Sequence, residues 1–265
     1  GNRTSSGHQP GAWSYNAENQ LTQYPALQNG QTLATQVQYN AQGHTQKEIN
    51  SRSTKTYQYN VAERLVRYEE IGSSAPVQAS YRYDPYGRRI SKTTTQSGNS
   101  QTTYYAYGSS GLLAELNDQG VVTKAYGWNP QAADLWSTAP LWQAETNPQN
   151  ASLSNSATAY HYLHTDHLET PVLGTDKSGT QTWKAISEAF GETKVDTNST
   201  ITMNLRFAGQ YFDDESGRHQ NYFRDYYSRS GRYMQRDPIG LSGGLNVHGY
   251  AAVSSQLLTL RTVLL

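Results

Sequence analysis

A four-residue unit that recurs along the first half of the chain constrains the fold more than any other feature. Its pattern is aromatic-x-Tyr-(Asn/Asp), and it occurs as "WSYN", "VQYN", "YQYN", "YRYD" and, more loosely, "YAYG". The second tyrosines of these units are Tyr15, Tyr39, Tyr59, Tyr83 and Tyr107, which lie 24, 20, 24 and 24 residues apart. A fixed period of this length is typical of a repeat architecture, in which each unit is one supersecondary element.

Each repeat is predicted to form a β-hairpin. Tyrosines at positions i and i+2 place both rings on one face of a strand. The following Asn, Asp or Gly supplies a turn, and the next stretch, such as "NVAERLVRYEE", has strand character again. A single hairpin is not stable alone, so neighbouring repeats are expected to pair into a curved antiparallel array with exposed edges. The first residues, "GNRT", resemble the second half of a unit, so the chain is expected to begin inside a repeat.

Composition supports an ordered all-β protein. Only 35% of the residues are hydrophobic, but 21 tyrosines and a net charge of zero argue against disorder, which favours few aromatics and high net charge. The balance of 21 basic and 21 acidic residues gives no electrostatic footprint for nucleic acid or an anionic membrane. Without cysteine there are no disulfides or thiolate metal sites.

Targeting signals are not evident in this chain. No apolar run approaches ~18 residues, so no membrane span is predicted. The start of the chain, "GNRTSSGHQP", has neither the charged nor the apolar region of a signal peptide. Export would therefore need a specialised route or an upstream segment.

Four regions are predicted, the first two from the repeat spacing and the local composition and the last two from the family resemblance described below. Residues 1–128 form the repeat array, and residues 129–159 form an insertion rich in Pro, Ala, Asn and Ser that contains a short strand at "PLWQAE". Residues 160–252 form a distinct core region, and residues 253–265 form an atypical tail.

The core region contains two long motifs. Residues 160–176 read "YHYLHTDHLETPVLGTD", and residues 206–250 read "RFAGQYFDDESGRHQNYFRDYYSRSGRYMQRDPIGLSGGLNVHGY". The first resembles the His-x-Asp-His-Leu-Gly-Thr-Pro segment of the rearrangement hotspot (Rhs) family, and the second is similar to the Rhs-associated core. The repeats resemble the YD repeats of that family, which is related to the C components of insecticidal toxin complexes.

The resemblance implies a hollow β-shell, with the core region lining or plugging one end and a variable C-terminal toxin inside. This chain is accordingly expected to be a C-terminal part of such a shell, acting in competition between bacteria. The implied partners are upstream shell segments, a C-terminal toxin, its immunity protein and a secretion-system adaptor, with release through a specialised route such as type VI secretion. No cofactor, nucleic acid or metal is expected.

The resemblance also implies a half-site for chemistry. In the family, self-cleavage is attributed to two aspartates, one in an Arg-Asp-Pro motif and one in a second Asp-Pro-x-Gly-Leu motif about two dozen residues later. Arg236 and Asp237 match the first motif, but residues 253–265, "VSSQLLTLRTVLL", contain no acid, glycine or proline. The favoured prediction is therefore that Asp237 starts a turn that Pro238 fixes. Self-cleavage is the alternative.

Two other groups of polar residues are candidates for binding. His164, Asp166 and His167 are residue types that bind metals, but their spacing along a strand and the lack of a fourth ligand argue against a metal site. The resemblance to the Rhs family implies that this segment is a structural turn. The acids of "FDDESG" lack the spacing of the known calcium loop and are predicted to form a solvated turn.

The repeat tyrosines leave a further function open. Sugar rings stack on aromatic faces, so the array could be a cell-surface carbohydrate-binding or adhesion module. Tyrosine at repeat spacing more often packs between strands, so a structural shell segment is the favoured hypothesis.

Overall fold

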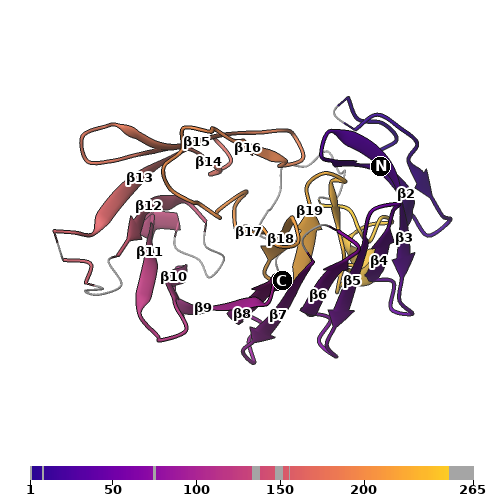
Figure 1. Cartoon of the computed structure of the whole chain (residues 1–265), viewed down its shortest axis with the longest axis horizontal. Helices are drawn as coiled ribbons and strands as arrows, with labels where there is room; N and C mark the ends of the chain where they lie inside the picture. Colours follow the sequence, from indigo (N-terminus) through magenta and orange to yellow (C-terminus); the bar gives the residue numbers. More distant parts are fainter. Residues whose placement is uncertain are drawn as a thin grey trace. The chain divides into compact units, whose positions relative to one another are not determined.

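Strands and tight turns make up nearly all of the regular structure (Figure 1). The structure is a computed structural model, and it describes residues 2–7, 9–73, 76–132, 138–146, 152–154 and 156–250. Two short 3₁₀ turns, η1 (Pro130–Ala132) and η2 (Gly240–Gly243), are the helical elements of these residues. The predicted all-β class is confirmed.

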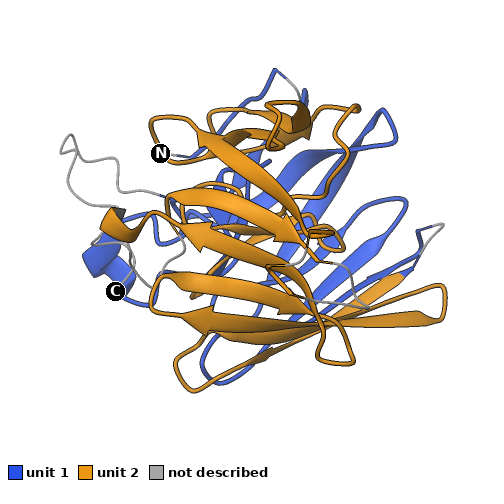
Figure 2. Cartoon of the chain, turned by 90° about the vertical axis from the view of Figure 1, so that its left-hand side faces the viewer, with its two compact units in different colours: residues 1–76, 224–265 blue, residues 77–223 orange. Residues whose placement is uncertain are grey.

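The chain divides into two compact units (Figure 2). Unit 1 contains residues 1–76 and 224–265, and unit 2 contains residues 77–223. Unit 1 therefore combines the first repeats with the end of the core region. The limits of array, insertion and core that the sequence suggests stay a prediction.

The strands of unit 1 pair antiparallel in chain order. Their turns follow the rules of short hairpins: Asn29 and Gly30, between β2 and β3, both have positive φ, at 48° and 74°. That conformation matches the twist of the flanking strands and favours an Asn-Gly pair. The strands are β1 (Ser14–Tyr15), β2 (Leu21–Gln28), β3 (Gln31–Tyr39), β4 (Thr45–Ile49), β5 (Thr54–Tyr59), β6 (Leu65–Ile71), and, in the core region, β19 (Arg224–Tyr227) and β20 (Arg232–Tyr233).

Unit 2 continues the same pattern. In β7 and β8 the register is regular from Val77, which pairs with Gln96, to Arg82, and it shifts between Arg82 and Tyr83. The strand predicted within the insertion is present as β12. The strands are β7 (Val77–Tyr83), β8 (Arg89–Gln96), β9 (Asn99–Gly108), β10 (Gly111–Leu116), β11 (Val122–Trp128), β12 (Pro140–Glu145), β13 (Ala159–Thr165), β14 (Pro171–Thr175), β15 (Gln181–Ser187), β16 (Thr193–Val195), β17 (Tyr211–Asp213) and β18 (Arg218–Asn221).

The Asn or Asp of each repeat closes its hairpin. Asn60 Oδ1 accepts hydrogen bonds from the backbone N–H groups of Ala62 and Arg64, both at 3.0 Å. Asn60 N–H also donates to Arg64 O at 3.0 Å, so the turn is closed twice. Side-chain oxygens accept from the N–H groups two and four residues later in the same way at Asn16, Asn40, Asp84, Asn117, Asp166 and Asp176.

The fourth residue of these turns adopts the left-handed conformation. Glycine occupies this position in four turns, at Gly43, Gly87, Gly120 and Gly179, with φ between 76° and 83°. Glu63 and Glu169 occupy it in two others, with φ of 63° and 62°. A residue with a Cβ is strained there by about 1–2 kcal/mol, so these two turns are held by their hydrogen bonds against a local cost. The related Rhs motif has glycine at the position of Glu169.

The second tyrosine of a repeat ties that repeat to the preceding one. In three repeats the hydroxyl donates to the backbone carbonyl of the first residue in the strand after the previous turn, and the ring is half-buried. Such a bond contributes about 1 kcal/mol net. The pairs are Tyr39 to Leu21 at 3.0 Å, Tyr59 to Thr45 at 2.7 Å and Tyr107 to Arg89 at 3.0 Å.

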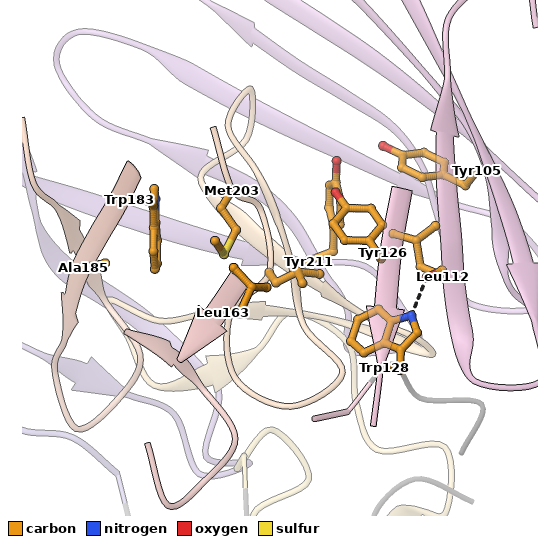
Figure 3. Packing of buried hydrophobic residues seen from close by; sticks show 10 residues of the cluster. Tyr105, Leu112, Tyr126, Trp128, Leu163, Trp183, Ala185, Met203 and Tyr211 are labelled. Carbon is orange, nitrogen blue, oxygen red and sulfur yellow. Dashed lines mark hydrogen bonds between the residues drawn. The ribbon is translucent and has the colours of Figure 1, made fainter. Parts of the chain in front are cut away.

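A hydrophobic cluster forms the core of unit 2 (Figure 3). Trp183 and Met203 are 1% and 2% exposed, and Leu163 packs with them. Trp128 is oriented by a hydrogen bond from its Nε1–H to Leu112 O at 2.7 Å. Full burial of a large apolar side chain stabilises a fold by about 1.5–3 kcal/mol, so this cluster is a main source of stability for unit 2.

Replacing the strained Glu169 should stabilise the protein. We expect Glu169→Gly to raise the free energy of unfolding by about 0.5–1 kcal/mol, because glycine relieves the left-handed strain but loses more entropy on folding. Gly179 lies at the same position of the next turn, and a Cβ there would meet nothing within 4 Å. Gly179→Ala is thus the matched control and should lower the stability by about 1 kcal/mol. Urea unfolding measures both, and a destabilised Glu169→Gly would contradict the strain argument.

Candidate functional site

The Arg-Asp-Pro segment lies in unit 1 and is separated from the end of β20 by two residues. Its backbone is held from both sides: Met234 N–H donates to Asp225 O at 2.8 Å, and Asp237 N–H donates to Val247 O at 2.8 Å. The chain then enters η2, and Gly240 N–H donates to Asp237 O at 2.9 Å. These bonds fix the position of Asp237 at the start of a tight turn.

The Asp237 carboxylate has two described contacts. Oδ1 accepts a hydrogen bond from Ile239 N–H at 3.1 Å, and Oδ2 lies 3.2 Å from Arg224 Nη1 in an ion pair. The side chain is 15% exposed, and the Arg224 guanidinium stacks on the Tyr233 ring with its carbon 3.6 Å from the ring centre. A carboxylate that caps its own turn and neutralises a buried guanidinium has the contacts of a structural residue.

Arg236 contacts the turn of the second repeat. Its backbone N–H donates to His44 Nδ1 at 3.3 Å, and its side chain lies so close to Gly43 that a Cβ at that position would clash with it. The structure therefore brings Arg236 together with His44, a residue that the sequence did not single out. No local signal marks His44, because its partner lies 192 residues away.

A second arginine, Arg232, connects the ends of unit 1. Its Nη1 donates to Asn2 Oδ1 at 2.7 Å, and its Nη2 donates to the carbonyl of Asn19 in the first repeat turn and to Asn246 Oδ1. The guanidinium also lies over the Tyr15 ring at 5.2 Å. Arg232 is 6% exposed, and its burial lowers its pKa. The side chain anchors the core segment, meaning residues 224–250 of the core region, to the first repeat.

Two of the three acids of "FDDESG", Asp213 and Glu215, have buried side chains in unit 2, so the predicted solvated turn is wrong for them, whereas Asp214 is exposed. Asp213 is 2% exposed and receives Arg89 Nη1 at 2.6 Å and Lys92 Nζ at 3.0 Å. Glu215 accepts from Lys92 Nζ at 3.0 Å and from the Tyr81 hydroxyl at 2.8 Å. Two cations from β8 supply the charge that makes burial of these acids possible.

Tyrosine rings surround this charge cluster. The Arg89 guanidinium carbon lies 5.4, 5.1 and 5.3 Å from the ring centres of Tyr81, Tyr105 and Tyr211. Tyr211 also donates to Glu115 Oε1 at 2.8 Å, and that oxygen accepts from Tyr126 at 2.5 Å. The cluster therefore joins β7, β8 and β9 to the β17–β18 hairpin through buried polar contacts.

The electrostatics of the cluster differ between its two acids. Burial would raise the pKa of Asp213, but Arg89 and Lys92 outweigh it and hold that pKa below its ordinary value of 3.8. Burial and the neighbouring Asp213 charge raise the pKa of Glu215 above its ordinary range. Asp213 is thus the acid whose charge the fold stabilises.

The "HTDH" residues form a turn of the repeat type. Asp166 Oδ1 accepts from Leu168 N–H at 2.8 Å and Thr170 N–H at 3.0 Å, as the Asn or Asp of each repeat does. His164 Nε2 lies 3.0 Å from Thr175 Oγ1. In the part of the chain that the structure describes, no three His, Asp or Glu side chains are grouped as in a metal site.

Several repeat tyrosines are buried in the array or donate hydrogen bonds within it. Tyr57, Tyr81 and Tyr105 are 1%, 3% and 6% exposed, and the second tyrosines of three repeats donate their hydroxyls to backbone carbonyls. These contacts support packing over sugar stacking for these residues.

Two further predictions concern the tail and membrane spans. The atypical tail, residues 253–265, lies outside the described residues. Among the described residues, no helix has the length and apolar character needed to span a membrane.

Comparison with known proteins gives consistent similarities. The sequence model of the teneurin YD-shell family matches residues 140–242. Double-stranded DNA deaminase toxin A of Burkholderia cenocepacia is 32% identical over 223 residues, which is 77% of this chain and 15% of the relative. Toxin protein Tse5 of Pseudomonas aeruginosa is 29% identical over 211 residues, 73% of this chain and 16% of the relative. The chain thus spans about one-sixth of the length of these relatives.

Solved structures show the same fold. The TcdB2-TccC3 structure matches with a TM-score of 0.58 at 19% identity, over 90% of this chain and 13% of that chain. A Photorhabdus luminescens Tc holotoxin pore structure matches with a TM-score of 0.60 at 18% identity, over 90% of this chain and 12% of that chain.

The hairpins closed by Asn or Asp and tied by tyrosine, together with the appended core segment, define a YD-repeat protein. Within that class, the chain belongs to the Rhs family.

The two buried acids should respond differently to neutralisation. Asp213→Asn is expected to lower the free energy of unfolding at neutral pH by about 3–5 kcal/mol, because Arg89 and Lys92 lose their counter-charge. Glu215→Gln should cost about 1 kcal/mol, because burial already disfavours the Glu215 charge. Urea unfolding distinguishes them, and equal losses would show that the acids are equivalent.

The pH dependence follows from the direction of the Asp213 shift. Because its folded pKa lies below 3.8, Asp213 stabilises the fold fully above that value and loses this contribution as the pH falls through the folded pKa. The stability difference between wild type and Asp213→Asn should therefore shrink below about pH 4.

Proposed function

We propose that the chain is a shell segment of an Rhs-type toxin, which encloses a C-terminal effector and delivers it in competition between bacteria. The observation that carries this proposal is the hydrogen bond by which three of the repeats are tied to the repeat before them. Tyrosine hydroxyls bond the carbonyls of the preceding repeat, so the array extends by adding identical steps. An extended sheet of this kind can form a wall around another polypeptide.

The relatives support the toxin context. Two of them bear the printed names double-stranded DNA deaminase toxin and toxin protein, and a third, from Dickeya dadantii, is a probable deoxyribonuclease named RhsA. We infer that the corresponding partners of this chain are further shell segments, an effector with its immunity protein, and a secretion-system adaptor. Release from the cell through a specialised secretion system belongs to the same proposal.

Enclosure can be tested on the longest polypeptide encoded around this chain. We expect its effector region to resist limited proteolysis in the native protein and to become sensitive once urea unfolds the array. The same effector expressed alone is the control. Equal digestion rates for the native and the isolated effector would overturn the proposal.

The array itself should associate. β1 pairs with β2 and β16 pairs with β15, and the described residues show no partner strand on their outer sides. Unpaired strand edges are templates for further pairing. We expect light scattering to show concentration-dependent oligomers of the purified chain, and a clean monomer at high concentration would count against an edge-extended shell.

Self-cleavage at the Arg-Asp-Pro segment is the second proposal. The fixed position and partial exposure of the Asp237 carboxylate are compatible with self-cleavage. Its ion pair with Arg224 favours the role in the turn. We expect intact mass spectrometry of the purified chain to show only the full-length mass. A shorter product that disappears in Asp237→Asn would reverse this preference and assign a protease role to Asp237.

A further inference from the structure

His44 is a buried histidine at the contact between a repeat turn and the Arg-Asp-Pro segment, both within unit 1. It is 1% exposed, and its ring packs against the Tyr59 ring with centres 5.2 Å apart. Nδ1 accepts the hydrogen bond from Arg236 N–H at 3.3 Å. To accept this bond, Nδ1 must carry no proton.

Contacts on both sides of His44 also fix the Arg-Asp-Pro segment on the second repeat turn. Thr45 N–H donates to Met234 O at 2.9 Å, and the Arg236 side chain occupies the space above Gly43. Tyr39, at the other end of the turn, packs edge-on against His248 with ring centres 5.7 Å apart. His44 therefore belongs to a docking surface made by residues 39–45.

Charged and titratable groups face His44 from each packed element. Glu63 Oε1, in the next repeat turn, lies 3.5 Å from His44 Nε2. Arg236 and His248 belong to the core segment. Burial lowers the pKa of His44 below 6.5, Glu63 raises it and Arg236 lowers it, with a net lowering. The ring is therefore neutral at pH 7.

We propose that His44 is a pH-dependent latch: its neutral ring holds the Arg-Asp-Pro segment on the second repeat turn, and its protonated ring releases that segment. Protonation would place an N–H on Nδ1 opposite the N–H of Arg236, so two donors would face each other. It would also add a positive charge beside Arg236. Both effects act on the same contact and weaken it.

The direction of the pH effect follows from the lowered pKa. A histidine that is harder to protonate in the docked state than in the released state stabilises docking above its ordinary pKa of 6.5. That stabilisation is lost as the pH falls from 6.5 through the pKa of the docked ring. Glu63, which favours the cation, sets how far below 6.5 the release occurs. The latch operates whether or not the shell encloses a toxin.

Amide hydrogen exchange of residues 234–240 tests the latch. After correction for intrinsic exchange rates, we expect wild-type protection of Arg236 N–H to fall about tenfold between about pH 7.5 and about pH 5. In His44→Asn, an amide oxygen that does not titrate replaces Nδ1 as acceptor. Protection in this variant should be the same at both pH values, with circular dichroism confirming that it folds.

Other variants separate the latch from general acid effects. Glu63→Gln should shift the transition to lower pH, because it removes the group that favours the cation. His164→Asn, at an exposed histidine of unit 2, should behave as the wild type does. Burial lowers the pKa of His248 to about 3, so His248→Asn should keep the transition. The latch is overturned if His44→Asn retains the wild-type pH dependence, or if His248→Asn abolishes it.

Discussion

One hydrogen-bonding side chain per repeat, the Asn or Asp after the second tyrosine, is the element on which the rest of the structure depends. A tight turn leaves backbone N–H groups without strand partners, and the side-chain oxygen satisfies two of them, as at Asn60. Closing the turn fixes the register of the hairpin, and the register decides which face the tyrosines occupy. Only then can Tyr59 reach the carbonyl of Thr45 in the preceding repeat. The contacts between repeats therefore depend on the hydrogen bonds that close each turn.

This dependence explains how well the sequence predicts the array. The period, the turn residues and the tyrosine spacing are local features, so hairpins and an all-β class could be predicted without knowing any distant contact. The same logic accounts for Asp166, whose apparent metal motif is another turn of the repeat type. What the pattern does not reveal is strain, because Glu63 and Glu169 stand where a left-handed residue is required.

The buried charges could not be predicted in the same way. Asp213 lies 124 residues from Arg89 and 121 residues from Lys92, so a reading of neighbouring residues makes "FDDESG" look solvated. One signal was present. Arg89 follows its turn at the position where other repeats have Leu21 or Leu65, and a buried strand position that changes from leucine to arginine requires a counter-charge. For the same reason the sequence gives no indication of His44, because its partner Arg236 lies 192 residues away.

The bond between Arg232 and Asn2 has a consequence for the order of folding during synthesis. It joins residues 230 positions apart, and both belong to unit 1, whose two segments are separated in the chain by all of unit 2. A ribosome completes the first repeats long before Arg232 emerges. Unit 2 is continuous in sequence, and all of its residues are synthesised before Arg232. Unit 2 can therefore finish folding first. The first repeats must wait, with their docking surface for the core segment uncovered, until the residues from Arg224 onward have been made.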